Sequence, residues 1–170
     1  MVRTKNLKGY SDVHHTTPGV AKRVIEHFNP TLPCLEPCRG TGVFYDQLPP
    51  GTDWCEITEG RDFFEYTAPV DWIVTNPPFG DLTRWLEHSF EVAQNIVFVI
   101  PLSKLFSSAP RLEIVRSYGS VRELLYLGRG RSIGFDIGFP FAGIHFVKGR
   151  SCDTKWTWAS ERFPPEESDG

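Results

Sequence analysis

The chain has 170 residues, 40% of them hydrophobic, which is enough for one domain with a proper core but not for two full-sized domains. Its formal net charge is −3 at pH 7, so no overall positive field attracts nucleic acid, and any such binding needs a local basic patch. The four cysteines lack the density and spacing of a secreted disulfide framework, and no apolar stretch is long enough to span a membrane. We therefore expect reduced thiols, no membrane association and a cytoplasmic protein.

The two ends of the chain differ in composition from its middle. Residues 1–13 are polar and lack the apolar core of a signal peptide, so we expect a flexible segment there. Residues 161–170 are acidic and rich in proline, which predicts a disordered tail. A single domain over residues 14–160 is the expected organisation.

Within that domain, short apolar runs alternate with helical stretches, a pattern typical of a mostly parallel α/β sheet with crossover helices. Thr17 and Pro18 introduce a helix over residues 19–28, and we expect Thr17 to cap it. Further helices are expected over residues 43–48, 81–93 and 111–118. Strands are expected over residues 34–36, 53–57, 70–75, 96–101, 121–127 and 143–147.

A glycine-rich turn follows the first expected strand, in the segment EPCRGTG that runs from Glu36 to Gly42. Doubly wound sheets bind nucleotide-like ligands at this position, because glycines let the backbone approach the ligand and the following helix offers free amides. A turn of this kind also occurs for structural reasons alone.

Two acidic residues follow the next expected strand. Glu56 stands at its end, where a carboxylate would accept hydrogen bonds from both hydroxyls of a ribose. Its distance from Gly42 is shorter than in dinucleotide-binding proteins and a third glycine is missing, which disfavours NAD. Asp62, beside Phe63, could accept a hydrogen bond from the amino group of an adenine, or could simply cap a turn.

The tetrapeptide Asn76-Pro77-Pro78-Phe79 follows the strand expected over residues 70–75. Two consecutive prolines hold one rigid shape and do not continue the strand. The Asn76 side chain and an adjacent backbone carbonyl can then act as two hydrogen-bond acceptors beside an aromatic ring. Such a pocket suits a planar ring with an amino group, as in a nucleobase flipped out of its strand.

These segments occur in the order TTPG, EPCRGTG, Glu56, GRDFF and TNPPFG, which resembles the S-adenosylmethionine-dependent amino-methyltransferases, especially those that methylate N6 of adenine. The resemblance covers residues 14–148. It implies a Rossmann-like class I methyltransferase fold, with a mostly parallel seven-stranded sheet whose last strand is antiparallel. It also implies S-adenosyl-L-methionine as cofactor and nucleic acid as partner, with DNA favoured and RNA possible.

The resemblance further assigns roles to residues. The methionine part of the cofactor would lie against Glu36, Gly40 and Gly42, the ribose against Glu56, and the adenine against Asp62 and Phe63. The full set of expected cofactor-binding residues is Thr17, Pro18, Glu36, Pro37, Gly40, Gly42, Glu56, Ile57, Asp62, Phe63 and Asn76. The expected catalytic residues, which would hold the target base, are Asn76, Pro77, Pro78 and Phe79.

An aryl amine is a poor nucleophile, because its lone pair is delocalised into the ring. Acceptors on both N–H groups, from the Asn76 side chain and the Pro77 carbonyl, would favour a pyramidal nitrogen, so positioning and oriented dipoles would carry most of the catalysis. Direct in-line transfer needs no covalent nucleophile. Cys38 follows a proline, as the nucleophile of cytosine-C5 methyltransferases does, but lies in the first glycine loop, so we interpret it as a packing residue. We expect no metal site.

Two loops at the same edge of the expected sheet carry candidate substrate-binding residues, namely Lys104, Arg129, Arg131 and Phe135. Arginines among glycines next to an aromatic fit phosphate contact and base stacking. The alternative for the second loop is a solvated hairpin tip. His14 and His15 could contact substrate, but an exposed position at the helix entry is the simpler expectation.

The chain has no room for a separate recognition domain, so target recognition would come from short loops or from a partner subunit. We rank adenine in DNA first, adenine or guanine in RNA second, and glutamine in protein third. A non-catalytic, nucleic-acid-binding subunit with the same fold is the alternative from another class.

Overall fold

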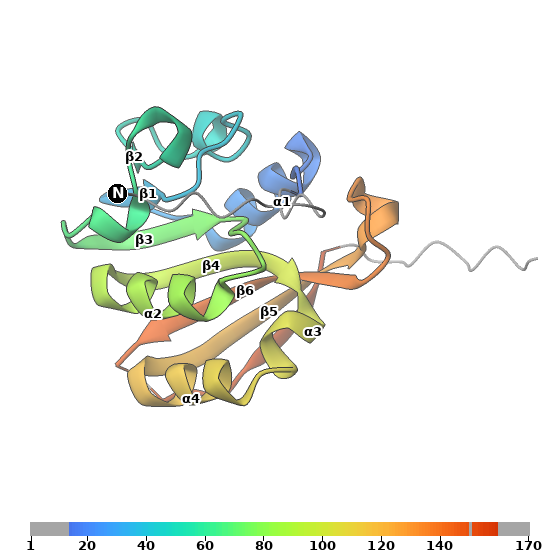
Figure 1. The fold of residues 1–170 in the computed structure, drawn as a ribbon. Coiled ribbons are helices and arrows are strands. Elements are labelled where there is room, and N and C mark those ends of the chain that lie inside the picture. Colours follow the sequence, from blue (N-terminus) through green and yellow to red (C-terminus); the bar gives the residue numbers. More distant parts are fainter. Residues whose placement is uncertain (1–13, 150, 160–170) are drawn as a thin grey trace, which may run out of the picture.

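The structure is a computed structural model that describes residues 14–149 and 151–159; the expected flexible segment and acidic tail lie outside the described residues. At its centre is a sheet of seven strands (Figure 1). The strands are β1 (Cys34–Glu36), β2 (Asp53–Trp54), β3 (Val70–Thr75), β4 (Ala93–Pro101), β5 (Gly119–Arg129), β6 (Pro140–Lys148) and β7 (Lys155–Trp158). Their order across the sheet is β2-β1-β3-β4-β6-β5-β7.

The sheet is mostly parallel, as expected. Strand β6 pairs antiparallel with β4 and with β5, and the remaining pairs are parallel. The antiparallel strand is thus the last of those expected from the sequence. The last strand along the chain, β7, was not expected, and it runs parallel to β5 at the edge of the sheet.

The predicted strand bounds are confirmed for β1 and β3, whereas β2 is shorter than predicted. The backbone turns after Trp54 into a short 3-10 helix, η2 (Ile57–Glu59), and the Glu56 carboxylate accepts a hydrogen bond from the backbone N–H of Thr58 at its start. The prediction of a strand through residue 57 was therefore wrong, because a side chain competes for the backbone donors there.

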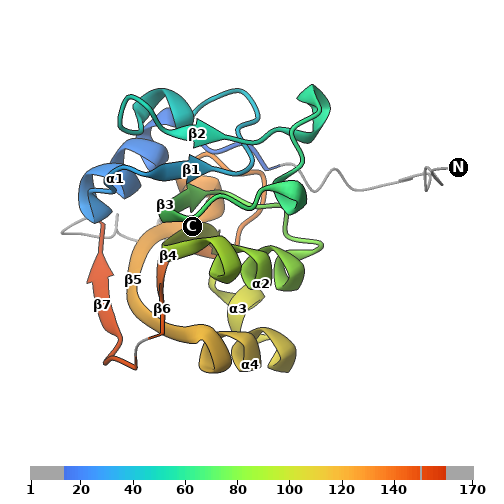
Figure 2. The same cartoon turned by 90° about the vertical axis from the view of Figure 1, so that its left-hand side faces the viewer.

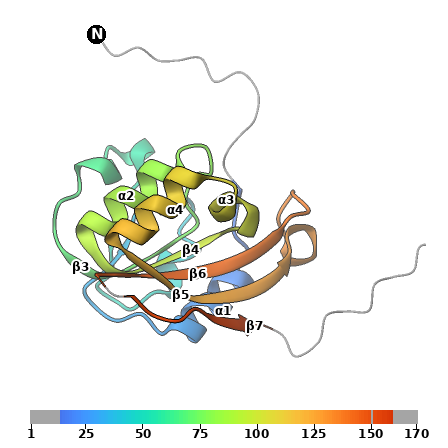
Figure 3. The ribbon, with the colours of Figure 1, turned by 90° about the horizontal axis from the view of Figure 1, so that it is seen from below.

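Helices cover both faces of the sheet. They are α1 (Pro18–Phe28), α2 (Leu82–Val92), α3 (Leu102–Phe106) and α4 (Ala109–Tyr118). Helices α2, α3 and α4 lie on one face and α1 lies on the other (Figures 2 and 3). Adjacent residues of β6 show the division, because Phe28 of α1 packs against His145 and Phe90 of α2 packs against Phe146.

Three local predictions about helices need correction. The expected helix over residues 43–48 is a single 3-10 turn, η1 (Tyr45–Gln47), and the expected loop after residue 101 begins with α3. Thr17 is the N-cap residue of α1, but its side chain makes no capping bond. Its hydroxyl instead donates a hydrogen bond to the carbonyl of Ile133, at 3.3 Å.

The order of the strands creates a switch point beside β1. The chain leaves β1 for β2 on one side and then returns to β3 on the other. In sheets of this kind ligands bind in the crevice outside the carboxyl ends of the strands, where the order reverses. None of the helices in the described ranges is long and apolar enough to cross a membrane.

Candidate functional site

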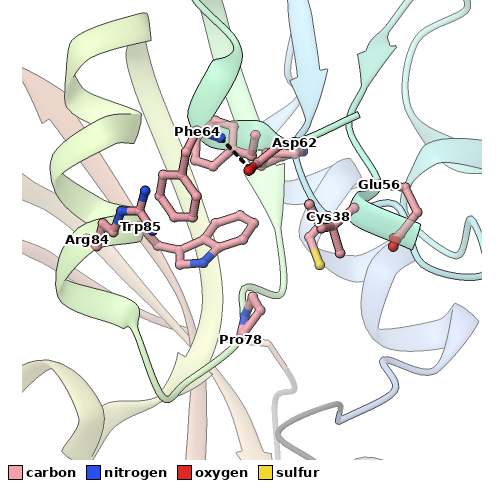
Figure 4. A pocket seen from close by; sticks show the side chains of 10 residues that line it. Cys38, Glu56, Asp62, Phe64, Pro78, Arg84 and Trp85 are labelled. Atoms are coloured by element: carbon pink, nitrogen blue, oxygen red, sulfur yellow. Dashed lines mark hydrogen bonds between the residues drawn. The ribbon is translucent and has the colours of Figure 1, made fainter. Parts of the chain in front are cut away.

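A cavity of about 300 Å³ opens at the carboxyl ends of β1, β2 and β3, the position of the switch point (Figure 4). Its volume is at the lower end of the range for small-molecule sites. Residues that follow each of the three strands contribute to the wall, together with the first turn of α2. The lining residues are Pro37, Cys38, Glu56, Ile57, Asp62, Phe63, Phe64, Pro78, Arg84 and Trp85.

One wall of the cavity is aromatic. The ring of Trp85, from α2, stacks on Phe63 with centroids 4.8 Å apart and meets the ring of Phe64 edge to face at 5.5 Å. The guanidinium of Arg84 lies 3.7 Å from the centroid of the Phe64 ring, which it covers on the side of α2 (Figure 4). Ile57 adds an apolar side chain that is 66% exposed. These surfaces suit a flat, apolar ring.

Two carboxylates bring hydrogen-bond acceptors to the cavity. Asp62 accepts a hydrogen bond from the backbone N–H of Phe64 at 2.9 Å, so it caps the short 3-10 helix η3 (Phe63–Glu65) and also lines the cavity (Figure 4). Glu56 accepts hydrogen bonds from the Gly40 amide at 2.8 Å and from the Thr58 hydroxyl at 2.8 Å. Burial raises the pKa of Glu56, but these bonds outweigh burial and hold that pKa below its ordinary value.

The glycine turn after β1 begins next to a second glutamate, Glu36, which is the last residue of that strand. Gly42 has a φ of +91°, and a side chain at that position would also lie 3.2 Å from the Asp46 carboxylate, so the turn requires glycine. Glu36 is 1% exposed and accepts a hydrogen bond from the Cys38 amide at 3.0 Å. Burial raises the pKa of Glu36 to about 8, with a smaller contribution from the nearby charge of Glu56.

The amides of this loop therefore face carboxylates and are not left open for an anion. Glu36 takes the amide of Cys38, and Glu56 takes the amide of Gly40. In a phosphate-binding loop the amides bind the phosphate oxygens themselves. The ionised carboxylate of Glu56, whose pKa is lowered, favours a ligand with positive charge over a nucleotide phosphate at this position.

Cys38 lines the cavity as a thiol. Burial, followed by the charges of Glu36 and Glu56, raises its pKa to about 12. A thiolate nucleophile is therefore disfavoured there. The finding agrees with the interpretation of Cys38 as a packing residue.

The turn after β3 borders the cavity through Pro78, and the side chain of Asn76 in this turn is bound by the segment that precedes α1. The Asn76 Nδ2 donates to the carbonyl of His14 at 2.6 Å and to the Thr16 hydroxyl at 3.0 Å. The Asn76 Oδ1 is buried and has no hydrogen-bond partner among the described residues. A buried acceptor without a partner is costly, and such groups are often completed by a ligand.

The ring of Phe79 is 3% exposed and lies between the rings of His14 and Phe141. The rings of Phe79 and His14 are nearly parallel, with centroids 5.0 Å apart, and the His14 Nδ1 lies 2.6 Å from the Asp136 carboxylate. The expectation of an exposed His14 is wrong, since its side chain is 9% exposed; His15 is exposed as expected.

The structure thus brings together part of the predicted set. Among the predicted cofactor residues, Pro37, Glu56, Ile57, Asp62 and Phe63 line the cavity, whereas Thr17, Pro18, Glu36, Gly40, Gly42 and Asn76 lie outside its lining. Phe64, Arg84 and Trp85 were missed. In the sequence, Trp85 belongs to the apolar face of an amphipathic helix, a pattern that predicts core packing equally well.

The predicted substrate residues lie apart from the cavity. Lys104 is half-buried in α3, while Arg129 and Arg131 are exposed at the end of β5 and in the 3-10 helix η4 (Gly130–Ile133). Phe135 is 5% exposed and stacks on Phe141, with centroids 4.1 Å apart. Base stacking by Phe135 is therefore contradicted, because its ring is part of the core. Across residues 14–149 and 151–159, no group of three His, Cys, Asp or Glu side chains could hold a metal ion.

Comparison with known proteins supports the fold. No protein-family model matches the chain, and no curated protein matches it at the level of sequence. A methyltransferase subunit of a type I restriction-modification system from Streptococcus thermophilus superposes with a TM-score of 0.64 and 15% identity, over 89% of this chain and 48% of that one. The type I restriction enzyme EcoKI M protein gives a TM-score of 0.63 and 16% identity, over 82% of this chain and 45% of that one.

A protein from Listeria monocytogenes, provisionally described as a class I S-adenosylmethionine-dependent methyltransferase, gives a TM-score of 0.58 and 10% identity, over 82% of this chain and 62% of that one. At these identities the likeness establishes the fold, which is the Rossmann-like fold of class I methyltransferases. The chain spans less than two thirds of the length of each of these three proteins.

Proposed function

We propose that this protein transfers a methyl group from S-adenosyl-L-methionine to an exocyclic amino nitrogen, and that the preferred acceptor is N6 of adenine in DNA. The observation that carries the proposal is the buried Oδ1 of Asn76, which has no partner in the part of the chain that the structure describes and lies in a rigid turn that borders the cavity. An amine donor is the natural partner for that oxygen. The fold is the one that class I methyltransferases use.

The residues of the cavity fit the methyl donor. Its adenine would lie between Ile57 and the aromatic wall, with its amino group near Asp62, and the ribose hydroxyls would meet Glu56. Glu36 and Glu56 would favour the positive charge of the methionine part. When bound, the donor supplies an electrophilic methyl group on a sulfonium.

Asn76 and Pro77 would act on the acceptor. Hydrogen bonds from the amino group to the Asn76 Oδ1 and to the Pro77 carbonyl favour a pyramidal nitrogen, whose lone pair can then be aimed at the methyl group. These acceptors are fixed in place before the reaction, which is the condition under which oriented dipoles contribute most. Phe79 would stack on the target ring after the His14 ring has moved away from the face of Phe79 that it covers.

Several features support a nucleic-acid substrate, with DNA ranked first. Two of the structural neighbours belong to type I restriction-modification systems. Arg129 and Arg131 offer exposed positive charge for phosphate, and Lys104 is a further candidate. We also propose that a partner subunit contributes to target recognition. RNA and, less favoured, protein glutamine are the alternative acceptors.

The substrate class can be tested directly. The purified protein is incubated with labelled S-adenosyl-L-methionine and, separately, with duplex DNA, single-stranded DNA, ribosomal RNA and protein, and the digested products are identified. We expect labelled N6-methyladenine from DNA. Label in RNA or glutamine would replace the substrate assignment, and cofactor and nucleic-acid binding without transfer would favour the non-catalytic subunit.

The role of Asn76 is tested by Asn76→Ala. We expect a fall in kcat of at least about 100-fold, the size of effect seen when a transition-state hydrogen bond is lost, with the affinity for S-adenosyl-L-methionine unchanged. Gln94→Ala is the matched control, since Gln94 is an exposed amide at the start of β4, at the opposite edge of the sheet. Turnover of Asn76→Ala at the control rate would overturn the mechanism.

A further inference from the structure

The segment that precedes α1 makes two hydrogen bonds to the side chain of Asn76, in the turn after β3. The Asn76 Nδ2 has two hydrogens, and it lies 2.6 Å from the carbonyl oxygen of His14 and 3.0 Å from the hydroxyl oxygen of Thr16. Thr16 is 9% exposed. Both N–H groups of the amide are therefore occupied, whereas the amide oxygen is buried and has no partner within residues 14–149 and 151–159.

These contacts determine which end of the amide faces the segment. A backbone carbonyl only accepts hydrogen bonds, so the atom of Asn76 nearest to His14 must be the nitrogen. A flipped amide would place two acceptor oxygens 2.6 Å apart. The Thr16 hydroxyl adds a second fixed point, and two hydrogen bonds together restrict rotation of the amide plane where a single one would leave it free to turn.

We infer that Thr16 is a positioning residue of the acceptor site: with the His14 carbonyl, it holds the nitrogen of the Asn76 amide so that the oxygen alone is left for the amino group of the substrate. The inference rests on the proposed function for the identity of the substrate. It assigns the N-terminal segment to the acceptor half of the site, beyond the cofactor role expected for the neighbouring Thr17 and Pro18.

Two variants separate the hydroxyl group of Thr16 from its methyl group. Thr16→Val removes the acceptor and keeps the branched side chain, whereas Thr16→Ser keeps the hydroxyl. We expect Thr16→Val to lower kcat about tenfold, the effect of one lost hydrogen bond, with KM for S-adenosyl-L-methionine unchanged and with Thr16→Ser close to wild type. Should Thr16→Val fail to fold, Thr16→Ala removes the same hydroxyl without adding a methyl group to the site.

A second readout does not depend on methyl transfer. In 15N-labelled protein, the side-chain NH₂ of Asn76 should exchange slowly with solvent in wild type and in Thr16→Ser, and at least about tenfold faster in Thr16→Val, since one of its hydrogens is released. Equal exchange in all three proteins would overturn the inference, as would a loss of kcat in Thr16→Ser equal to that in Thr16→Val. Absence of methyl transfer by wild type would instead refute the proposed function, while the exchange comparison still decides the positioning.

Discussion

Substitution of Glu36 by glutamine should make the protein more stable, and increasingly so as the pH rises. Glu36 is 1% exposed, and burial raises the pKa of its carboxyl from an ordinary value of 4.5 to about 8. The unfolded chain therefore ionises this group at a lower pH than the folded protein does. For a carboxyl with a raised pKa, stability is greatest below the unfolded value and declines up to the folded value, here between about pH 4.5 and 8.

The size of the effect follows from the two pKa values. Each unit of difference corresponds to more than about 1 kcal/mol, so between pH 5 and pH 7 the free energy of unfolding of wild type should fall by about 2 to 3 kcal/mol relative to that of Glu36→Gln. Glutamine keeps an oxygen that can accept the bond from the Cys38 amide and carries no charge to desolvate. For a chain of this size, the corresponding difference in Tm is about 5 to 10 °C.

The assay is urea unfolding of wild type and Glu36→Gln without cofactor at pH 5, 6 and 7. Glu123→Gln serves as the control with the opposite sign: burial raises the pKa of Glu123, but hydrogen bonds from Thr157 and His27 outweigh burial and lower that pKa. Loss of Glu123 should therefore cost about the same stability at pH 5, 6 and 7, because the contribution of a carboxyl with a lowered pKa is complete above its ordinary value of 4.5 and is lost only as the pH falls below it. A stability difference between wild type and Glu36→Gln that is the same at pH 5 and pH 7 would refute the reasoning.

Three further predictions concern packing, the acceptor face and nucleic-acid contact. A side chain at Gly119 would clash with a backbone carbonyl of β6, so Gly119→Ala should lower the free energy of unfolding by about 1 to 3 kcal/mol. Gly19 has open space around it, so Gly19→Ala should not destabilise the protein, and urea unfolding tests both variants. His14→Ala uncovers Phe79 and should lower KM for the nucleic acid without changing cofactor affinity, so a raised KM in steady-state kinetics would count against it. Arg129→Ala should reduce the slope of log binding constant against log salt by about 1, and an unchanged slope would exclude phosphate contact there.

The sequence predicted the structure best where the residues of one short segment are enough to determine its conformation. The bounds of β1 and β3 agree with prediction, because each is an apolar run that ends at a proline-containing turn. The glycine turn, the acidic residue after β2 and the Asn76 turn follow three strands that topology places at one edge, so their proximity could be expected. The same reasoning did not predict that Phe135 is buried, because an aromatic side chain in a glycine-rich loop can face either solvent or the core.

Contacts between distant segments could not be predicted. Nothing in the sequence near His14 indicates that its ring stacks on Phe79 or that its carbonyl binds Asn76. Strand β7 carries Trp156 and Trp158 with about half of each side chain exposed, so it lacks the buried alternation by which strands are recognised. It pairs with β5 through backbone hydrogen bonds, and the groups that make such bonds are present in every sequence, so they do not mark a strand.

Glu36 and Glu56 differ in the pKa of their carboxyls because burial dominates at Glu36, whereas hydrogen bonds outweigh burial at Glu56. Glu56 accepts hydrogen bonds from two backbone amides and a hydroxyl, and the pKa of its carboxyl is lowered; Glu36, which accepts an amide bond from Cys38, has a pKa of about 8. A cationic ligand favours the ionised form of Glu36, so its binding below pH 8 should release a proton. The affinity for S-adenosyl-L-methionine should therefore rise between pH 6 and pH 8, by up to about tenfold per unit, and calorimetry on wild type and Glu36→Gln isolates this contribution. Parallel pH profiles for the two proteins would mean that Glu36 stays protonated beside the ligand, and the positive charge would then be held by Glu56 alone.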